Sequence, residues 1–457
     1  MKRWWTVVAV GVAVFVAGLD MSITNVALPT LARGFGIDPG GVAWVVLAYN
    51  LPLVALLLPL GRWVDDLDKR GAFLAAVVGF AVASALCGLA PSLSWLIGGR
   101  LLQGASGALI AVLVPVLAIG AVDPSQRGRA MGIVGALGPL GSVSGPAVGG
   151  LLLASFGWRS IFFAVVPACS LAALIGWRTI SPEREGVFTP PRRAWVVEAT
   201  LLFAATAALF LALGRSPAGG TMGPASLALF GVAILGVILW LRLPAAEPVV
   251  TLISTRDFGA AALVFVLLAV VGGALYYLPP FFLQDVLHLS PQEIGLTLLA
   301  WPLAMSAVGP LGGYLADRWG TRPASLLGAV WITGALALLL PLSAGWSSVD
   351  VAWRLGLIGV GAGLFTGPVQ TALMSVAPTH LMGTAGALSG LARSLGFALG
   401  PALASTVWAY AGTGVGGMRA SLYTLLAVAA LAVVVAWTGR SSPGRPPAQP
   451  TVKEEVG

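Results

Sequence analysis

Long apolar segments follow one another along almost the whole chain, and they restrict it to one class of structure. Fourteen segments reach the roughly 20 residues that an α-helix needs to cross the hydrocarbon of a bilayer. Their approximate limits are 4–29, 42–60, 71–90, 94–120, 130–153, 160–180, 195–213, 225–243, 258–283, 294–313, 323–343, 353–376, 384–411 and 420–438. This pattern predicts an all-α integral membrane protein with fourteen spans.

The composition excludes a soluble globular protein. Hydrophobic residues make up 58% of the 457 residues and charged residues only 9%, whereas a soluble domain carries about 25% charged residues. Lipid tolerates an apolar exterior, so the bilayer is the expected surrounding. The net charge of +8 comes from short basic clusters between apolar segments. Such clusters set topology, and no nucleic-acid partner is expected.

The basic residues also predict the orientation of the chain. With the amino terminus in the cytoplasm, 18 of the 25 lysines and arginines fall on the cytoplasmic side, in agreement with the positive-inside rule. The first apolar segment is longer than the core of a signal peptide and contains Asp20, so we expect it to remain as a span. The prediction is a multi-pass protein of the cell (inner) membrane with both termini cytoplasmic.

An internal repeat predicts two helical bundles. The segment Gly61–Arg70 follows the second span, and the related segment Gly313–Arg322 follows the tenth. If the seventh and eighth spans are an insertion, each copy follows the second helix of a six-helix half, which is a common construction in transporters. The expected parts are a bundle over 1–180, a cytoplasmic linker over 181–194, two additional helices over 195–243, a cytoplasmic loop over 244–257, a second six-helix bundle over 258–438 and a disordered tail over 439–457.

Five ordered motifs resemble those of one transporter family. Gly313–Arg322 matches the pattern G-x-L-A-D-R-x-G-x-R of the major facilitator superfamily. Arg100–Gly104 is similar to its R-x-x-Q-G motif, and Gly141–Gly150 is similar to its antiporter motif G-x-x-x-G-P-x-x-G-G. Leu19–Pro29, and Gly157–Phe163 with its Gly-Trp-Arg, resemble the fourteen-helix drug:proton antiporters. The resemblance implies a major facilitator fold of two six-helix bundles plus two extra helices, and proton-coupled multidrug efflux.

The resemblance assigns the two related loops to the cytoplasmic gate. The residues carried over are Gly61, Asp65, Arg70, Gly313, Asp317, Arg318, Gly320 and Arg322. The first copy departs from the pattern, because Asp66 stands where the family has arginine and Asp68 where it has glycine. Asp65 and Arg70 remain available to form a pair.

Asp20 is the acid that lies most clearly inside a predicted span. A carboxylate there costs several kcal/mol unless it is paired, wet or protonated, so it marks function by default. Helix rise places Asp20 about 14 Å and Arg100 about 9 Å below the same membrane surface. The two side chains are therefore expected to interact, directly or through a polar cavity, and Asp20 is the predicted proton carrier. The alternative is a structural acid bonded to a neighbouring helix.

Small residues and prolines in the fifth span predict a helix that packs closely and can move. The antiporter-motif residues are Gly141, Gly145, Pro146, Gly149 and Gly150. Glycines allow backbones to approach, and proline removes a backbone donor and permits a kink. Generic close packing is the alternative explanation.

Polar and aromatic residues inside the spans are candidates for a substrate cavity. They are Asn25, Tyr49, Asn50, Gln103, Tyr276, Tyr277, Trp301, Phe365, Gln370 and Arg393. About a third of them are expected to line the cavity, because most membrane aromatics face lipid or the interface. Arg393 could instead hold carbonyl groups at a helix contact. Glu198 is interpreted as an interfacial acid at the start of the seventh span, where the helix dipole favours it.

The predicted function is export of small hydrophobic compounds (drugs or natural products) by alternating access, in exchange for protons. A monomer in the bilayer is expected, with no cofactor or metal. Cys87 and Cys169 fall inside apolar runs and indicate neither a disulfide nor a metal site. A channel stays open as an alternative, and so does a proton-coupled importer of one narrow substrate. An intramembrane enzyme using Gly104–Gly107 would need a histidine base, but His288 and His380 lie on opposite sides. The chain lacks a nucleotide-binding P-loop, which excludes a single-chain ATP-driven pump.

Overall fold

The computed structural model describes residues 2–64, 67–123, 127–182, 192–213, 223–378, 381–412 and 414–438. Within these ranges the chain forms helices and no strand. The first group of helices is α1 (Lys2–Phe35), α2 (Pro39–Trp63), α3 (Lys69–Gly88), α4 (Leu93–Gly120), α5 (Arg127–Phe156), α6 (Arg159–Phe163) and α7 (Val165–Thr179). They are followed by α8 (Arg193–Leu213), α9 (Pro224–Leu241), the short turn η3 (Pro244–Ala246) and α10 (Glu247–Ser254). The last group is α11 (Arg256–Phe281), η4 (Phe282–Val286), α12 (Pro291–Leu298), α13 (Ala300–Trp319), α14 (Thr321–Ala337), α15 (Ser348–Val376), α16 (Met382–Tyr410) and α17 (Val415–Thr438).

Polar residues between the apolar segments begin several helices by capping them. The carboxylate of Asp38 accepts a hydrogen bond from the backbone N–H of Gly41 at the start of α2. Asp68 caps α3 in the same way through the N–H of Gly71, at 2.7 Å. A cap of this kind satisfies one of the free N–H groups of a helix start. Asp68, which departs from the family loop pattern, therefore has a structural task at this position.

Among the described residues, twelve helical segments are long and apolar enough to cross a membrane. They coincide with twelve of the fourteen predicted segments, with α6 and α7 forming one span and α12 and α13 another. The two other predicted segments are also helical. One is α5, which contains the shorter apolar helix Leu140–Phe156, and the other is α14 with 17 residues. The structure thus has the helices of an integral membrane protein.

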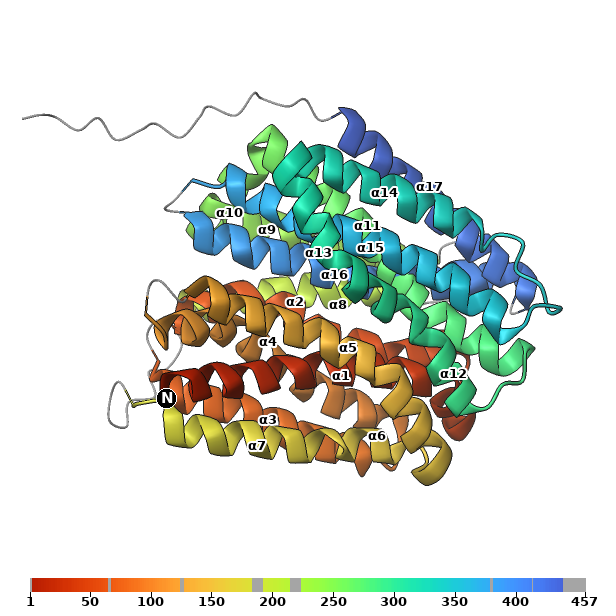
Figure 1. Ribbon diagram of the computed structural model, residues 1–457, viewed down its shortest axis with the longest axis horizontal. Coiled ribbons are helices and arrows are strands. Elements are labelled where there is room, and N and C mark those ends of the chain that lie inside the picture. The colour runs from red at the N-terminus through yellow and green to blue at the C-terminus, as the bar shows by residue number, and fades with distance from the viewer. Residues whose placement is uncertain are drawn as a thin grey trace, which may run out of the picture.

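The helices lie side by side in two groups (Figure 1). Helices α1 to α7 form the red-to-yellow group, and α11 to α17 form the green-to-blue group. Between them α2 packs on α16 and α5 packs on α12. We call the end of the bundle where α1 begins the amino-terminal side, and the end where α1 stops the distal side. Helix α12 lies on the distal side and α10 on the amino-terminal side.

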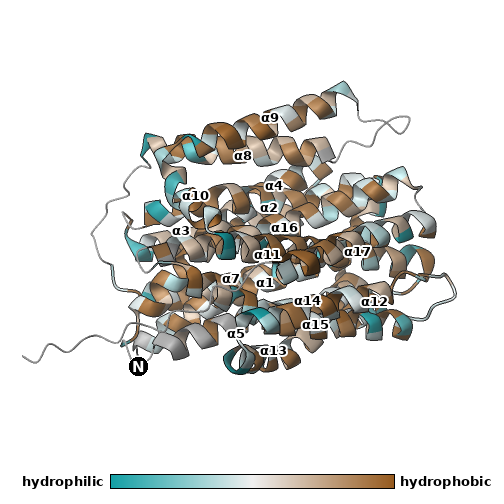
Figure 2. Ribbon diagram, turned by 90° about the horizontal axis from the view of Figure 1, so that it is seen from above, coloured by the Kyte–Doolittle hydropathy of each residue, from teal (hydrophilic) through white to brown (hydrophobic). Residues whose placement is uncertain are grey.

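The distribution of polar and apolar side chains is the reverse of that in a soluble protein. Apolar residues cover the helices along their length (Figure 2), and Leu227 and Ile234 of α9 are 58% and 60% exposed. In contrast, Asp20 and Arg100 are 0% and 1% exposed. Buried charges with an apolar exterior are expected when lipid replaces water as the solvent.

Helices α8 and α9 pack on each other and attach at one edge of the bundle, mainly to α2 (Figure 2). Glu198 of α8 is 0% exposed and forms an ion pair with Arg62 of α2, with 2.5 Å between Oε2 and Nη1. Its other oxygen accepts from Nε1 of Trp240 in α9 at 3.2 Å. The interpretation of Glu198 as an interfacial acid is therefore wrong. The packing of α8 on α2 removes this carboxylate from water and gives it two donors.

Some predicted features lie outside the described residues. They are Asp65 and Asp66 of the first loop copy, most of the expected linker (183–191), His380 and the expected tail (439–457).

Candidate functional site

The charged pair Asp20 and Arg100 is the centre of the candidate site. Nη1 of Arg100 lies 2.7 Å from Oδ2 of Asp20, so α4 and α1 are joined by a direct ion pair. The side chains are 2% and 0% exposed. Of the two arrangements that the sequence left open, the structure shows the direct one.

Gln103, one turn after Arg100 on α4, joins both partners of the pair. Its Oε1 accepts from Arg100 Nη1 at 2.6 Å, and its Nε2 donates to Asp20 Oδ1 at 2.7 Å. The same amide nitrogen donates to Oγ of Ser84 in α3, also at 2.7 Å. Each oxygen of Asp20 therefore has a donor, which is the condition under which a buried charge is tolerated.

Helix α2 completes the surroundings of Arg100. Its Nε donates to the backbone carbonyl of Val45 at 3.0 Å, and its guanidinium lies 4.6 Å from the centre of the Tyr49 ring. A guanidinium over an aromatic face gains from the ring quadrupole. The site thus draws on α1, α2, α3 and α4. Because its ion pair can exist only while Asp20 is ionised, a proton on this carboxyl would release Arg100 from its strongest contact.

A second feature is a small central cavity between the two groups of helices. It is lined by Ser22, Asn25, Val26, Pro146, Leu275, Tyr276, Leu298, Trp301 and Leu355. Its volume of about 10 Å³ is that of a single water site. A drug-sized ligand needs about 300 Å³ or more, so such a ligand could enter only if the groups separate.

Three of the ten cavity candidates line this central cavity, namely Asn25, Tyr276 and Trp301. Tyr276 packs its ring 4.9 Å from that of Trp301 and 5.7 Å from that of Phe397 in α16. The sequence reasoning missed Phe397, as well as Ser22 and Ser84. Ser84 was detectable as a polar residue inside the third span.

Five other candidates do not line the central cavity, in keeping with the expectation that only about a third would. Gln103 and Tyr49 are buried in the Asp20–Arg100 network. Asn50 donates to the carbonyl of Val46 in its own helix. Tyr277 and Phe365 are buried in side-chain packing. In each case the direction of the side chain around its helix, which neighbouring helices decide, turns it away from the central cavity.

Two candidates have exposed side chains. Gln370 lies toward the end of α15, and Arg393 lies near the middle of α16. A methyl group added at Gly390, three residues earlier on the same face of α16, would lie 3.2 Å from the side chain of Leu57 of α2, across the boundary between the two groups. No described carbonyl or carboxylate accepts a hydrogen bond from Arg393, so the structural role considered for this residue, holding carbonyls at a helix contact, is not what the structure shows.

The motif glycines of α5 meet two different helices. A methyl group added at Gly145 would lie 2.5 Å from Cβ of Ser22, and one at Gly141 would overlap the carbonyl oxygen of Phe15. Gly149 faces Ile23 of the same helix, α1. Gly150 instead approaches α12, with 2.6 Å between an added methyl and the carbonyl of Pro291. The motif therefore packs α5 within its own group and also across the group boundary, where Pro146 lies at the central cavity.

The gate-loop residues lie on the amino-terminal side. The guanidinium of Arg70 lies 5.8 Å from the ring of Trp177 in α7. Arg322 donates to the carbonyls of Ala436 and Trp437 at the end of α17, as suits a cation at a helix C-terminus. Arg318 donates to Tyr314.

Four further members of the loops lie at the ends of helices or within them. Gly320 ends α13 with a φ of +92°, which only glycine adopts easily. Asp317 is exposed, Gly61 lies at the end of α2, and Gly313 lies in α13, where an added methyl group would meet no other atom within 4 Å.

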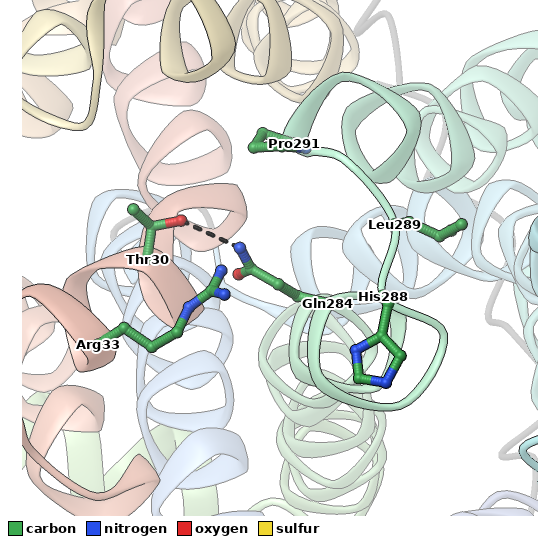
Figure 3. A pocket seen from close by; sticks show the side chains of 6 residues that line it. All are labelled: Thr30, Arg33, Gln284, His288, Leu289 and Pro291. Atoms are coloured by element: carbon green, nitrogen blue, oxygen red, sulfur yellow. Dashed lines mark hydrogen bonds between the residues drawn. The ribbon is translucent and has the colours of Figure 1, made fainter.

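A larger pocket of about 370 Å³ lies at the distal end of α1 (Figure 3). Thr30 and Arg33 of α1 face Gln284 of η4 and the segment His288–Pro291. Nε2 of Gln284 donates to Oγ1 of Thr30 at 3.3 Å, which links the two groups of helices. None of these residues was among the sequence candidates.

Comparisons with known proteins agree with this architecture. The Major Facilitator Superfamily model matches residues 10–401, with an overlapping match over 260–456. The chain is 32% identical over 411 residues to multidrug resistance protein Stp of Mycobacterium tuberculosis, covering 88% of this chain and 75% of Stp. It is 28% identical to the riboflavin transporter RibZ of Clostridioides difficile, covering 89% of both. A bacterial homologue of the human lysosomal transporter Spinster has a similar fold, with a TM-score of 0.72 at 17% identity over 97% of this chain and 99% of that one.

Proposed function

Since the chain belongs to the Major Facilitator Superfamily and is an integral membrane transporter, not an enzyme, we propose that it exports small, largely hydrophobic compounds in exchange for protons. The drug-efflux relatives Stp and JefA of Mycobacterium tuberculosis, at 32% and 30% identity, support export of such compounds. The proposed branch is that of the fourteen-helix drug:proton antiporters. The proposed location is the cell membrane, with both termini in the cytoplasm.

Fourteen spans are part of the proposal. The proposal counts α5 and α14 as spans in addition to the twelve clear ones. Each continues the up-and-down order of the helices before and after it in the chain. This order brings the amino-terminal side, with the basic loops at Lys69–Arg70 and Arg318–Arg322, to the cytoplasm.

The observation that carries the proposed coupling is the buried network of Asp20, Arg100 and Gln103. A charge in the membrane that is held by only a few polar groups is costly to leave unpaired. Protonation of Asp20 would break its pairing with Arg100 and so favour a different arrangement of α1 and α4. If substrate and proton compete for binding, the protein would carry the substrate in one direction and the proton in the other as it alternates between conformations.

A second candidate is uptake or export of one dedicated compound. The similarity to the riboflavin transporter RibZ, at 28% identity, favours this alternative. It differs from broad efflux in substrate range, so a panel of compounds separates the two.

The test is transport by the purified full chain in proteoliposomes with an imposed pH gradient. A panel of fluorescent hydrophobic compounds, with riboflavin included, would be compared for wild type, Asp20→Asn and the exposed-acid control Asp285→Asn. We expect gradient-driven transport in wild type and the control, and loss of at least tenfold in Asp20→Asn or after addition of an uncoupler. Exchange that persists in Asp20→Asn would contradict the proposed coupling. Transport of a single compound would favour the dedicated alternative.

A further inference from the structure

The aromatic wall of the central cavity has an unused hydrogen-bond donor. Nε1 of Trp301 has no hydrogen-bond partner in the described part of the chain, although Trp301 is only 6% exposed. A buried N–H without an acceptor is costly and uncommon in a folded protein. The ring of Tyr276 packs against the same indole at a tilt of 39°, and the ring of Phe397 packs against Tyr276 at a tilt of 46°. These three rings offer a planar ligand a stacking surface and one N–H donor.

An exposed cation lies one turn from this wall. Arg393 precedes Phe397 by four residues on α16, so both side chains share one face of the helix. It lies eleven residues after Met382, about 16 Å along the helix. Gly390 on the same face meets Leu57 of α2. This face of α16 is therefore turned toward α2.

No ion pair joins Arg393 to a described carboxylate, and the buried Asp20 is already held by Arg100 and Gln103. A cation at mid-membrane depth without a counter-ion is expensive, and such residues commonly mark a substrate pathway. On the opposite wall, Ser22 donates to the carbonyl of Ser142 and Asn25 donates to that of Met21. These donors of Ser22 and Asn25 are used by backbone carbonyls, whereas Nε1 of Trp301 in the same lining remains available to a ligand.

We propose that Arg393, Trp301 and the rings of Tyr276 and Phe397 form a subsite for planar aromatic compounds that carry an anionic oxygen group, such as a carboxylate or phenolate. The rings stack on the aromatic body, Nε1 of Trp301 donates to an oxygen, and Arg393 pairs with the negative charge. The subsite opens when the two groups of helices separate. This inference rests on the proposed function, since it names the class of compound that the exporter selects.

The test is binding of 1-pyrenecarboxylate and of the neutral 1-pyrenecarboxamide to the full chain in nanodiscs, without a pH gradient. Energy transfer from tryptophan to pyrene reports occupancy. We expect wild type to bind the carboxylate at least tenfold more tightly than the amide. Arg393→Gln removes this preference and leaves amide binding within twofold, Arg393→Lys keeps part of it, and Trp301→Phe weakens both compounds. The control Arg178→Gln, at the exposed end of α7, changes neither.

Equal affinity of the two compounds for wild type would overturn the subsite. So would a preference that survives in Arg393→Gln, or binding of neither compound. The assay contains no gradient, so it separates this inference from the proposed coupling. If Asp20→Asn still exchanges protons while the carboxylate preference holds, the coupling proposal fails and the subsite stands. If Asp20→Asn loses proton exchange but wild type does not prefer the carboxylate, the coupling proposal stands and the subsite fails.

Discussion

The guanidinium of Arg100 contacts a different partner on each of several sides and so holds one buried network together. It pairs with Asp20, bonds to Gln103 and the Val45 carbonyl, and covers the Tyr49 ring. Isolated, either charge would cost several kcal/mol at this depth. Together with Gln103 they satisfy each other, so removal of one polar member is expected to harm the others.

Replacing Gln103 by leucine tests this dependence. The change leaves Asp20 Oδ1 and Ser84 Oγ without the amide nitrogen, and a buried polar group without its partner costs about 1–3 kcal/mol. We expect a lower midpoint of thermal unfolding in detergent and impaired exchange. The control is Asn50→Ala, whose amide bonds only to the carbonyl of its own helix. A loss no larger than that of the control would show that Gln103 is not a bridging residue.

At the scale of single helices, α5 depends on glycine for its contact with α1. Gly141 and Gly145 face the backbone and Ser22 of that helix at distances that exclude a methyl group. Close approach of this kind replaces the hydrophobic driving force that lipid does not supply. A single methyl group added at either glycine is therefore expected to shift α5 relative to α1.

We predict that Gly145→Ala pushes α5 away from α1 and slows transport, because its methyl would lie 2.5 Å from Cβ of Ser22. Overpacking of a close contact costs about 1–3 kcal/mol. The control Gly309→Ala in α13 places a methyl where nothing lies within 4 Å. Transport rates and unfolding midpoints of both variants in proteoliposomes and detergent provide the check. Equal behaviour of the two variants would refute the close-packing argument.

The accessory pair α8–α9 is predicted to depend on Glu198. Glu198→Gln removes the charge that pairs with Arg62, whose side chain is 32% exposed. Since Arg62 keeps some contact with water, we expect a loss of about 1–3 kcal/mol, less than for a fully buried pair. Unfolding of Glu198→Gln, Arg62→Gln and the double variant gives the coupling energy, with the exposed Glu247→Gln of α10 as control. A coupling energy near zero would exclude the pair as an attachment.

For the whole molecule, the contacts between the two groups of helices are the ones that the proposed alternating access would open and close. On the distal side Gly150 of α5 approaches Pro291 of α12, and Thr30 of α1 bonds to Gln284 of η4. Alternating access requires such distal contacts to break during each cycle.

A covalent link across this boundary is therefore expected to stop transport. In Thr30→Cys/Gln284→Cys, a short bifunctional thiol reagent should join the two groups of helices and abolish transport. The native cysteines Cys87 and Cys169 are buried, so the reagent should react at the introduced pair. The pair Ser92→Cys/Trp95→Cys at the start of α4 is the control, since its link stays within one group. Full transport by the cross-linked first pair would show that the distal contact does not open.

The apolar segments and their lengths determined the helical membrane fold, because crossing a bilayer as helices leaves few other arrangements for such a composition. Helix rise alone placed Asp20 and Arg100 at similar depth, and the motifs indicated the family. Side-chain direction was not accessible in this way. A helix that is apolar on every face has no periodic pattern to show which face meets a neighbour. Only the packing of helices brought Gln103 to Asp20, turned Tyr277 and Phe365 into the interior and buried Glu198 against Arg62.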